Sequence, residues 1–221
     1  MARPSRDPWI DPEVAEYATA HSSSADDIQR RLIAETAERH SSNAQMQISP
    51  DEGVFLQVIT RATGARHAVE VGTFTGYSAL CIARALPAGG TLLCCDVSEE
   101  WTSIGQRYWT EAGVADKIEL RIGPAIDTLR SLPEDQRFDL AFIDADKPSY
   151  HAYYEEILAR MDAGGLILVD NTIWSGQVLD PEPGDANTMA LAAFNDALAA
   201  DDRVDVVMLT FRDGVTMARK R

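Results

Sequence analysis

Short apolar runs alternate with helix-like segments along most of this chain, and that rhythm restricts the fold more than any other feature. Five runs are apolar on both faces, as parallel strands covered on both sides are. Helix-like patterns separate them, and strands alternating with helices are typical of a doubly wound α/β sheet. The predicted strands are 67–72, 91–97, 118–123, 138–145 and 165–171, and the predicted helices are 76–86, 98–112, 124–132 and 149–161.

The end of the chain breaks this rhythm. Two strand-like runs, 204–211 and 215–219, flank Asp213 and Gly214. Asp-Gly between two such runs is a strong hairpin signal, so the sheet is expected to end in an antiparallel pair. The total becomes seven strands. Gly113 and Gly164 stand where glycines end helices, and we expect them to be helix C-caps.

The first 65 residues are expected to be helical. One helix is predicted from about residue 25 to residue 40. Ser49 and Glu52 form a capping-box pattern with proline at the first helical position, and Gly64 closes that helix. Residues 179–187 are rich in Pro, Gly and Asp and predict a surface loop. We expect one domain over 1–221, with a helical cover at 1–65 and a core at 66–221.

Composition narrows the function classes. The formal charge is −15 and the pI is about 4.6. An acidic chain lacks the basic face that nucleic acids require and is repelled by anionic membranes. No apolar stretch reaches membrane-spanning length and no leader pattern opens the sequence, so we expect a cytoplasmic protein. Cys81, Cys94 and Cys95 lack metal spacing and are expected to be buried, inert thiols.

The turn after the first predicted strand carries a cofactor signal. It reads EVGTFTGYS over 70–78, with G-x-x-x-G spacing and Phe74 where a dinucleotide site has glycine. This loop is too bulky for a pyrophosphate, which favours a nucleoside ligand without phosphates. Asp96 ends the second strand and can accept ribose hydroxyls. S-adenosylmethionine fits both features, while a plain turn and a surface aspartate are the alternative.

Acidic and amide side chains follow the fourth and fifth predicted strands. Asp144 ends one strand, and Asp170 and Asn171 end the other. If these strands are neighbours, the three side chains meet at one edge of the sheet. Two carboxylates and an amide oxygen suit Mg²⁺ or Ca²⁺, whereas ordinary turn and capping residues are the alternative. Lys147 follows directly and is either a general base or a solvated lysine.

Three motifs together, EVGTFTGYS, FIDADK and VDNTIWSG, resemble those of the cation-dependent, S-adenosylmethionine-dependent O-methyltransferases of the catechol and caffeoyl-CoA type. The resemblance covers residues 46–216 and matches the small bacterial members. It implies the seven-stranded Rossmann-like class I methyltransferase sheet, a homodimer, and in-line methyl transfer to an aromatic vicinal diol. Ser175 stands where the plant caffeoyl-CoA branch carries Asn, which favours a small free catechol over a coenzyme A thioester.

The resemblance also assigns site residues. It implies Mg²⁺, or Ca²⁺ or Mn²⁺, on Asp144, Asp170 and Asn171, with Lys147 and Asp144 catalytic. The implied substrate residues are Lys147, Trp174, Ser175 and Arg212. The implied S-adenosylmethionine residues are Met46, Ile48, Glu70, Gly72, Thr73, Phe74, Ser78, Asp96, Val97, Ala125, Asp144, Asp146 and Tyr153.

Three other functions compete with this interpretation. An NAD-dependent oxidoreductase is disfavoured by Phe74. An RNA methyltransferase is disfavoured by the charge of −15. A catalytically silent S-adenosylmethionine-binding protein would not need Asp144, Asp170, Asn171 and Lys147 together. We therefore expect an enzyme with a small aromatic partner, no nucleic acid and no membrane.

Overall fold

The structure is a computed structural model that describes residues 10–221. The chain divides into two compact units. The first unit is residues 22–132, and the second is residues 133–221 with the N-terminal segment through His21. The strands follow in the order β3-β2-β1-β4-β5-β7-β6 of a seven-stranded mixed sheet, which confirms the predicted fold class.

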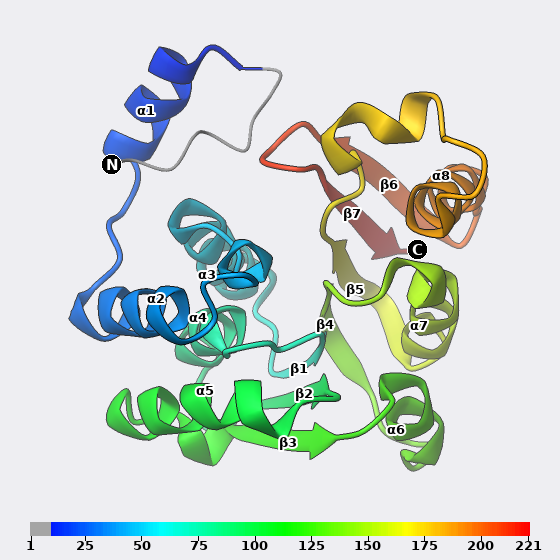
Figure 1. The fold of residues 1–221 in the computed structure, drawn as a ribbon. Helices are drawn as coiled ribbons and strands as arrows, with labels where there is room; N and C mark the ends of the chain where they lie inside the picture. Colours follow the sequence, from blue (N-terminus) through cyan, green and yellow to red (C-terminus); the bar gives the residue numbers. More distant parts are fainter. Residues whose placement is uncertain (1–9) are drawn as a thin grey trace. The chain divides into compact units, whose positions relative to one another are not determined.

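The first unit holds three parallel strands in the order β3-β2-β1 (Figure 1). Four of the five residues of β1 and five of the six of β2 are buried, as expected for strands covered on both faces. Its elements are α2 (Asp27–Arg39), η1 (Ala44–Met46), α3 (Pro50–Thr63), β1 (His67–Val71), α4 (Tyr77–Ala85), β2 (Thr91–Asp96), α5 (Glu99–Glu111), η2 (Ala115–Lys117), β3 (Ile118–Ile122) and α6 (Ala125–Ser131).

The second unit holds the strand order β4-β5-β7-β6. The first pair is parallel, and β7 pairs antiparallel with both β5 and β6. Its elements are α1 (Pro12–Ala20), β4 (Phe138–Ile143), η3 (Lys147–Ser149), α7 (Tyr150–Leu158), β5 (Met161–Val169), η4 (Trp174–Leu179), α8 (Ala186–Ala199), β6 (Val204–Leu209) and β7 (Val215–Lys220).

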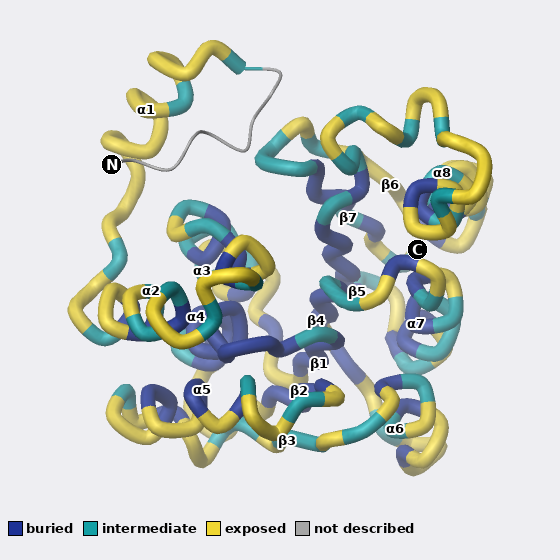
Figure 2. Tube along the Cα trace, viewed as in Figure 1, coloured by how far each residue is buried: buried dark blue, intermediate teal, exposed yellow. Residues whose placement is uncertain are grey.

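The ends of β4 and β5 are level. Ile143 is paired with Val169, and Asp170 N donates a hydrogen bond of 3.0 Å to Ile143 O. Both strands are buried toward these ends, where Figure 2 shows them dark. The residues that follow them therefore emerge together at one edge, as the prediction of neighbouring strands requires.

The antiparallel pair at the end of the chain is confirmed, with a longer turn than Asp-Gly alone suggests. Leu209 pairs with Val215, so residues 210–214 form the turn. Arg212 has φ +54° and Gly214 has φ +90°. Glycine tolerates this left-handed backbone without a steric penalty.

Three local predictions were wrong. Gly164 lies inside β5, with φ +97°, near a shift in the pairing of β4 with β5, so it serves an irregular strand rather than a helix end. The strand accordingly begins at Met161, where a helix end was expected. Ser49 makes no side-chain capping bond at α3, although Pro50 and Gly64 do bound that helix. Helix α8 was not predicted.

The prediction of buried thiols is confirmed. All three thiols are free and buried, and burial raises the pKa of Cys81 to about 11 and of Cys95 to about 12. They are therefore protonated and unreactive at neutral pH. No helix within residues 10–221 is long and apolar enough to cross a membrane.

Candidate functional site

Asp96, the last residue of β2, fixes the loop between β1 and α4 through hydrogen bonds. Its Oδ2 accepts the backbone N–H of Thr73 at 2.9 Å and of Phe74 at 2.7 Å, and its Oδ1 accepts that of Ser98 at 2.8 Å. A carboxylate has about four acceptor positions, so capacity for a ligand hydroxyl remains. The sequence predicted the ribose role and missed this loop-holding role.

Both glycines of the loop are required by its backbone. Gly72 and Gly76 have φ of +91° and +82°, and Phe74 is also left-handed at +48°. A Cβ on Gly76 would lie 2.6 Å from the Trp109 ring, whose Nε1–H donates to Gly76 O at 2.9 Å. The G-x-x-x-G spacing thus builds a tight turn beside an indole.

Glu70 places a carboxyl group in the interior below this loop. The residue is fully buried, and only its Oε2 has a hydrogen-bond partner, the Cys94 thiol at 3.5 Å. Its Oε1 and the buried Thr73 Oγ1 have none. Burial raises the pKa of Glu70 to about 7, against the opposing effect of nearby Ser78, Thr73 and Cys94. Unsatisfied buried acceptors call for an explanation, and a cationic or hydroxyl-bearing ligand supplies one.

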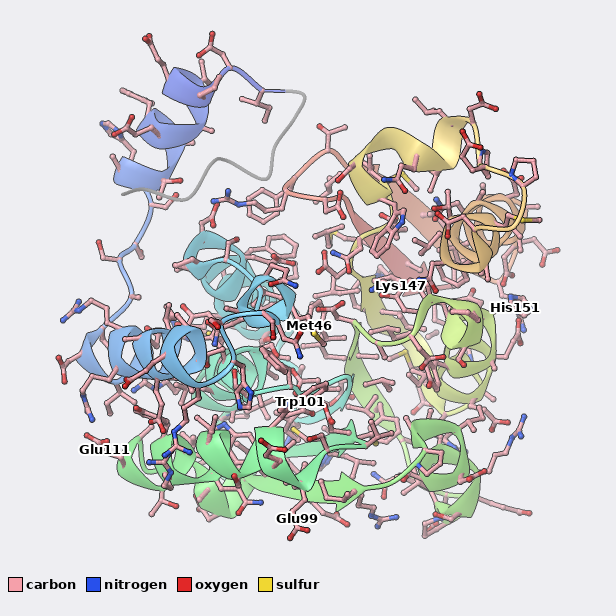
Figure 3. All side chains as sticks on the ribbon, viewed as in Figure 1. Met46, Glu99, Trp101, Glu111, Lys147 and His151 are labelled. Carbon is pink, nitrogen blue, oxygen red and sulfur yellow. The ribbon has the colours of Figure 1, made fainter. Side chains whose placement is uncertain are left out.

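The remaining cofactor candidates of the first unit differ in exposure. Ile48, Ser78 and Ala125 are buried, whereas Val97 is 69% exposed and Met46 is 46% exposed. Figure 3 labels Met46 and Trp101. The Trp101 ring packs edge-on against Phe74 with 5.2 Å between centroids, so two aromatic rings lie together at the glycine loop.

The predicted acidic cluster at the ends of β4 and β5 is present. Lys147 Nζ donates to Asp144 Oδ1 at 3.1 Å and to Asn171 Oδ1 at 2.6 Å. Asn171 donates to Asp170 through its backbone N–H at 2.7 Å and its Nδ2 at 3.0 Å. Asn171 has φ +60°, a conformation that Asn tolerates better than most residues. Two of the three predicted metal ligands, Asp144 and Asn171, therefore both bond to Lys147 Nζ.

Tyr150 completes the surroundings of Lys147, and the sequence analysis missed it. Its Oη accepts from Lys147 Nζ at 2.5 Å and donates to Asp170 O at 3.2 Å. Burial, together with the charges of Asp144 and Asp170, raises its pKa well above the usual value, so it stays a phenol. The signal was its place three residues after Lys147, one helical turn along.

Lys147 is only 7% exposed, and aromatic rings line its position. Its Nζ lies 4.7 Å from the Tyr150 ring centroid and 5.5 Å from that of Trp174. The alternative of a solvated surface lysine is therefore excluded. Arg212, the other cationic candidate, is partly buried with its guanidinium over Phe211.

Asp146 and Tyr153 are predicted cofactor residues, the first before helix α7 and the second on it. Asp146 Oδ1 accepts a hydrogen bond of 2.6 Å from Tyr153 Oη, so these two cofactor candidates lie together. His151 is exposed and points away from Lys147 (Figure 3).

The oxygen donors of Asp144, Asp170 and Asn171 fit a hard cation such as Mg²⁺ by their chemistry. Among residues 10–221, no cluster of three or more His, Cys, Asp or Glu side chains is arranged to hold a metal ion. The candidate set has only two carboxylates, and its third donor is an amide. Lys147 Nζ donates hydrogen bonds to two oxygens of this set, Asp144 Oδ1 and Asn171 Oδ1.

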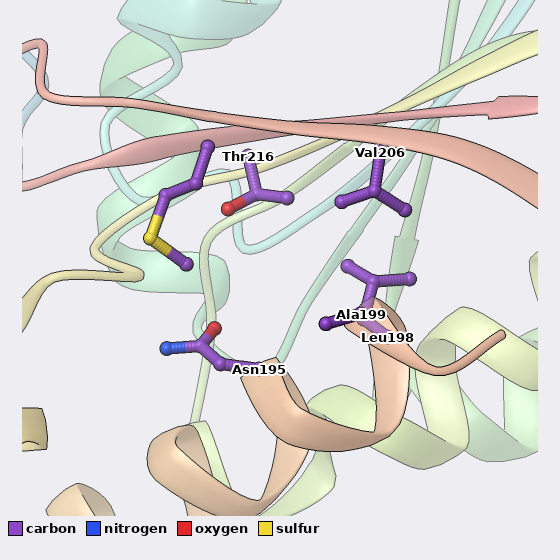
Figure 4. Close-up of a pocket in the computed structure, with 6 residues that line it drawn as sticks. Asn195, Leu198, Ala199, Val206 and Thr216 are labelled. Atoms are coloured by element: carbon purple, nitrogen blue, oxygen red, sulfur yellow. The ribbon is translucent and has the colours of Figure 1, made fainter.

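A separate cavity of about 280 Å³ lies between α8 and the β6–β7 pair (Figure 4). None of the predicted site residues lines it. Asn195, at its edge, donates from Nδ2 to Thr172 O at 2.7 Å and so supports the residue after Asn171. The cavity is lined by Asn195, Leu198, Ala199, Val206, Met208 and Thr216.

Known proteins resemble this chain over nearly its whole length. The family model described as "O-methyltransferase" matches residues 19–221. The chain is 37% identical to "Probable caffeoyl-CoA O-methyltransferase 1" of Dictyostelium discoideum, covering 94% of this chain and 91% of that protein. It is 42% identical to "Caffeoyl-CoA O-methyltransferase 2" of Zea mays, over 79% of this chain and 70% of that one.

A solved structure agrees with these relatives. The O-methyltransferase TomG of Streptomyces achromogenes, involved in tomaymycin synthesis and solved in complex with S-adenosylmethionine, is 29% identical with a TM-score of 0.85. The match covers 94% of this chain and 96% of TomG. The chain therefore belongs to the O-methyltransferase family and is an S-adenosylmethionine-dependent O-methyltransferase of the caffeoyl-CoA O-methyltransferase type.

Proposed function

We propose that this enzyme methylates one hydroxyl of a small aromatic vicinal diol with the help of a divalent cation. The observation that carries the proposal is the convergence of Asp144 and Asn171 oxygens on Lys147 Nζ, at the level ends of β4 and β5. A proton acceptor beside hard oxygen donors is the arrangement that activation of a hydroxyl needs.

The first unit supplies residues for the methyl donor. The buried Glu70 carboxyl has an unsatisfied oxygen that suits the donor's ammonium group. Asp96 fixes the loop and keeps acceptor capacity for a ribose hydroxyl. Carboxylates are compatible with this donor, because its sulfonium is positively charged.

The cluster around Lys147 supplies the groups for the acceptor. Lys147 first releases one proton to solvent, and its Nζ then receives the proton of the acceptor hydroxyl. The acceptor oxygen then forms a bond to the methyl carbon while the carbon–sulfur bond breaks, which releases S-adenosylhomocysteine. Asp144, Asp170 and Asn171 would hold the cation, which would supply Lewis acidity toward the two hydroxyls of the diol. Tyr150 keeps Lys147 in place through a hydrogen bond, and the Trp174 ring lies beside Lys147.

Two acceptor classes are compatible with the comparisons. The names of the plant and Dictyostelium relatives point to a caffeoyl coenzyme A thioester. Ser175, in place of the Asn of the plant branch, supports a free catechol, which we favour. A homodimer in the cytoplasm is part of the proposal, and the molar mass from light scattering tests its dimeric state.

The experiment uses matched acceptors with S-adenosylmethionine and Mg²⁺. We would compare 3,4-dihydroxycinnamate, its 3,5-dihydroxy isomer and its coenzyme A thioester by mass spectrometry. Methylation of the 3,4-isomers alone supports the vicinal diol, and the preferred form of that isomer identifies the acceptor class. Equal methylation of the 3,5-isomer would overturn the diol requirement. Absence of product from every acceptor, with the donor bound, would favour a silent binding protein.

One variant separates the two halves of the proposal. Asp170→Ala should abolish turnover while the dissociation constant for S-adenosylmethionine stays within a few-fold of the parent value. Full activity of Asp170→Ala with Mg²⁺ present would contradict the proposed cation ligands.

A further inference from the structure

The segment after Asn171 has an unusual backbone. Trp174 and Ser175 are left-handed at φ +50° and +51°, and Gly176 follows at +81°. Two consecutive non-glycine residues in this conformation are unfavourable, by about 1 kcal/mol or more each. Such a backbone persists only where the surrounding structure holds it.

Asp213, in the turn between β6 and β7, provides that hold. Its backbone oxygen accepts the N–H of Ile173 at 2.9 Å and of Trp174 at 3.3 Å. Its side-chain Oδ1 accepts the N–H of Ser175 at 2.5 Å and contacts Ser175 Oγ at 3.4 Å. One residue therefore takes hydrogen bonds from three successive backbone amides.

The neighbouring residues fix the same contact. Gly214 O accepts the N–H of Thr172 at 3.0 Å. A Cβ on Gly214 would lie 2.5 Å from Ile173 Cγ1 and 2.6 Å from Ile173 N. The turn thus lies directly against the segment, and the Asp213 carboxylate bonds to the Ser175 amide.

The backbone of this segment determines where Trp174 lies relative to Lys147. The Trp174 ring centroid lies 5.5 Å from Lys147 Nζ, and residues 174 and 175 both have the left-handed backbone that Asp213 bonds to. We propose that Asp213 is a positioning residue that sets acceptor affinity by holding Trp174 beside Lys147. This inference rests on the proposed function, in which Trp174 and Ser175 lie next to the acceptor.

The hold does not depend on the Ser175 hydroxyl. The short bond uses the backbone N–H of Ser175, and the contact with its Oγ is the long one. An Asn at position 175 would keep the backbone bond. The side chain at 175 can therefore vary between relatives while Asp213 continues to place the segment.

The test compares Asp213→Ala, Asp213→Asn and Asp205→Ala. Asp213→Asn keeps an acceptor oxygen at the same place. Asp205 lies in β6 of the same hairpin and pairs with Arg221 at 2.8 Å, so its variant is the control for a changed charge. We would measure KM for the diol, kcat, KM for S-adenosylmethionine and the thermal midpoint.

We expect Asp213→Ala to raise KM for the diol about tenfold, which is the size of one hydrogen bond to a charged group. kcat and KM for S-adenosylmethionine should stay within about twofold. Asp213→Asn should recover most of the loss, and Asp205→Ala should match the parent. An unchanged diol KM in Asp213→Ala, or an equal loss in both KM values and thermal midpoint, would overturn the proposal.

A second measurement needs no turnover. The near-ultraviolet circular dichroism of the parent minus that of Trp174→Phe isolates the signal of Trp174. Asp213→Ala should lose that signal, and Asp213→Asn should keep it. If the parent methylates no diol, the proposed function fails, and this signal still decides whether Asp213 places Trp174. A retained signal in Asp213→Ala would refute the positioning role.

Discussion

Glu70 should make the stability of the unliganded protein depend on pH. The carboxyl is fully buried, and burial raises its pKa from 4.5 to about 7. Because the folded value lies above the unfolded one, its contribution to stability is fully present below pH 4.5 and is lost as pH rises through 7. Between pH 5 and pH 8.5 this difference corresponds to roughly 2–3 kcal/mol of unfolding free energy.

Urea unfolding of the parent and Glu70→Gln isolates this contribution, because other titrating groups are common to both proteins. We expect the parent to lose roughly 2–3 kcal/mol relative to Glu70→Gln on going from pH 5 to pH 8.5. Parallel pH profiles for the two proteins would refute the raised pKa of Glu70. They would also remove the argument that its buried oxygen awaits a cationic ligand.

Three further predictions concern the loop, the cluster and the turn. Asp96→Ala leaves three backbone amides without their acceptor and should weaken S-adenosylmethionine binding by roughly tenfold or more in calorimetry; unchanged affinity would contradict its loop role. Tyr150→Phe should lower kcat while Tyr154→Phe, whose hydroxyl contacts Asp201, should not; equal rates would exclude Tyr150 from the site. Gly214→Ala should lower the free energy of unfolding in urea by about 2–4 kcal/mol, because its Cβ would clash with Ile173. Gly64→Ala, whose Cβ would enter open space, should lower it by about 1 kcal/mol. Similar losses in the two variants would disprove the steric argument.

Much of the fold could be predicted, because buried parallel strands are apolar without interruption. The run from Leu140 to Ile143 and the one ending at Val169 carry that pattern through to their ends, so the residues after them could be placed together. The same pattern could not locate the start of β5. Gly164 is compatible with both a helix end and an irregular strand, and only the pairing with β4 decides between them.

The site was less predictable where a residue acts through its backbone contacts. Asp144 and Lys147 stand out by type and spacing, but Tyr150 looks like ordinary helix packing until its hydroxyl is placed 2.5 Å from Lys147 Nζ. The sequence places Asp213 in a hairpin turn, whereas its bonds to residues 173–175 depend on contacts between distant parts of the chain. Such contacts leave no local pattern.

The central claim is that methyl transfer to a vicinal diol depends on a cation at Asp144, Asp170 and Asn171. The most direct measurement is the rate of methylated-product formation in protein treated with EDTA, before and after excess Mg²⁺ is restored. We predict no product in EDTA and recovery of the full rate with Mg²⁺. An unchanged rate in EDTA would leave the methyltransferase assignment intact and contradict the proposed role of the three ligands.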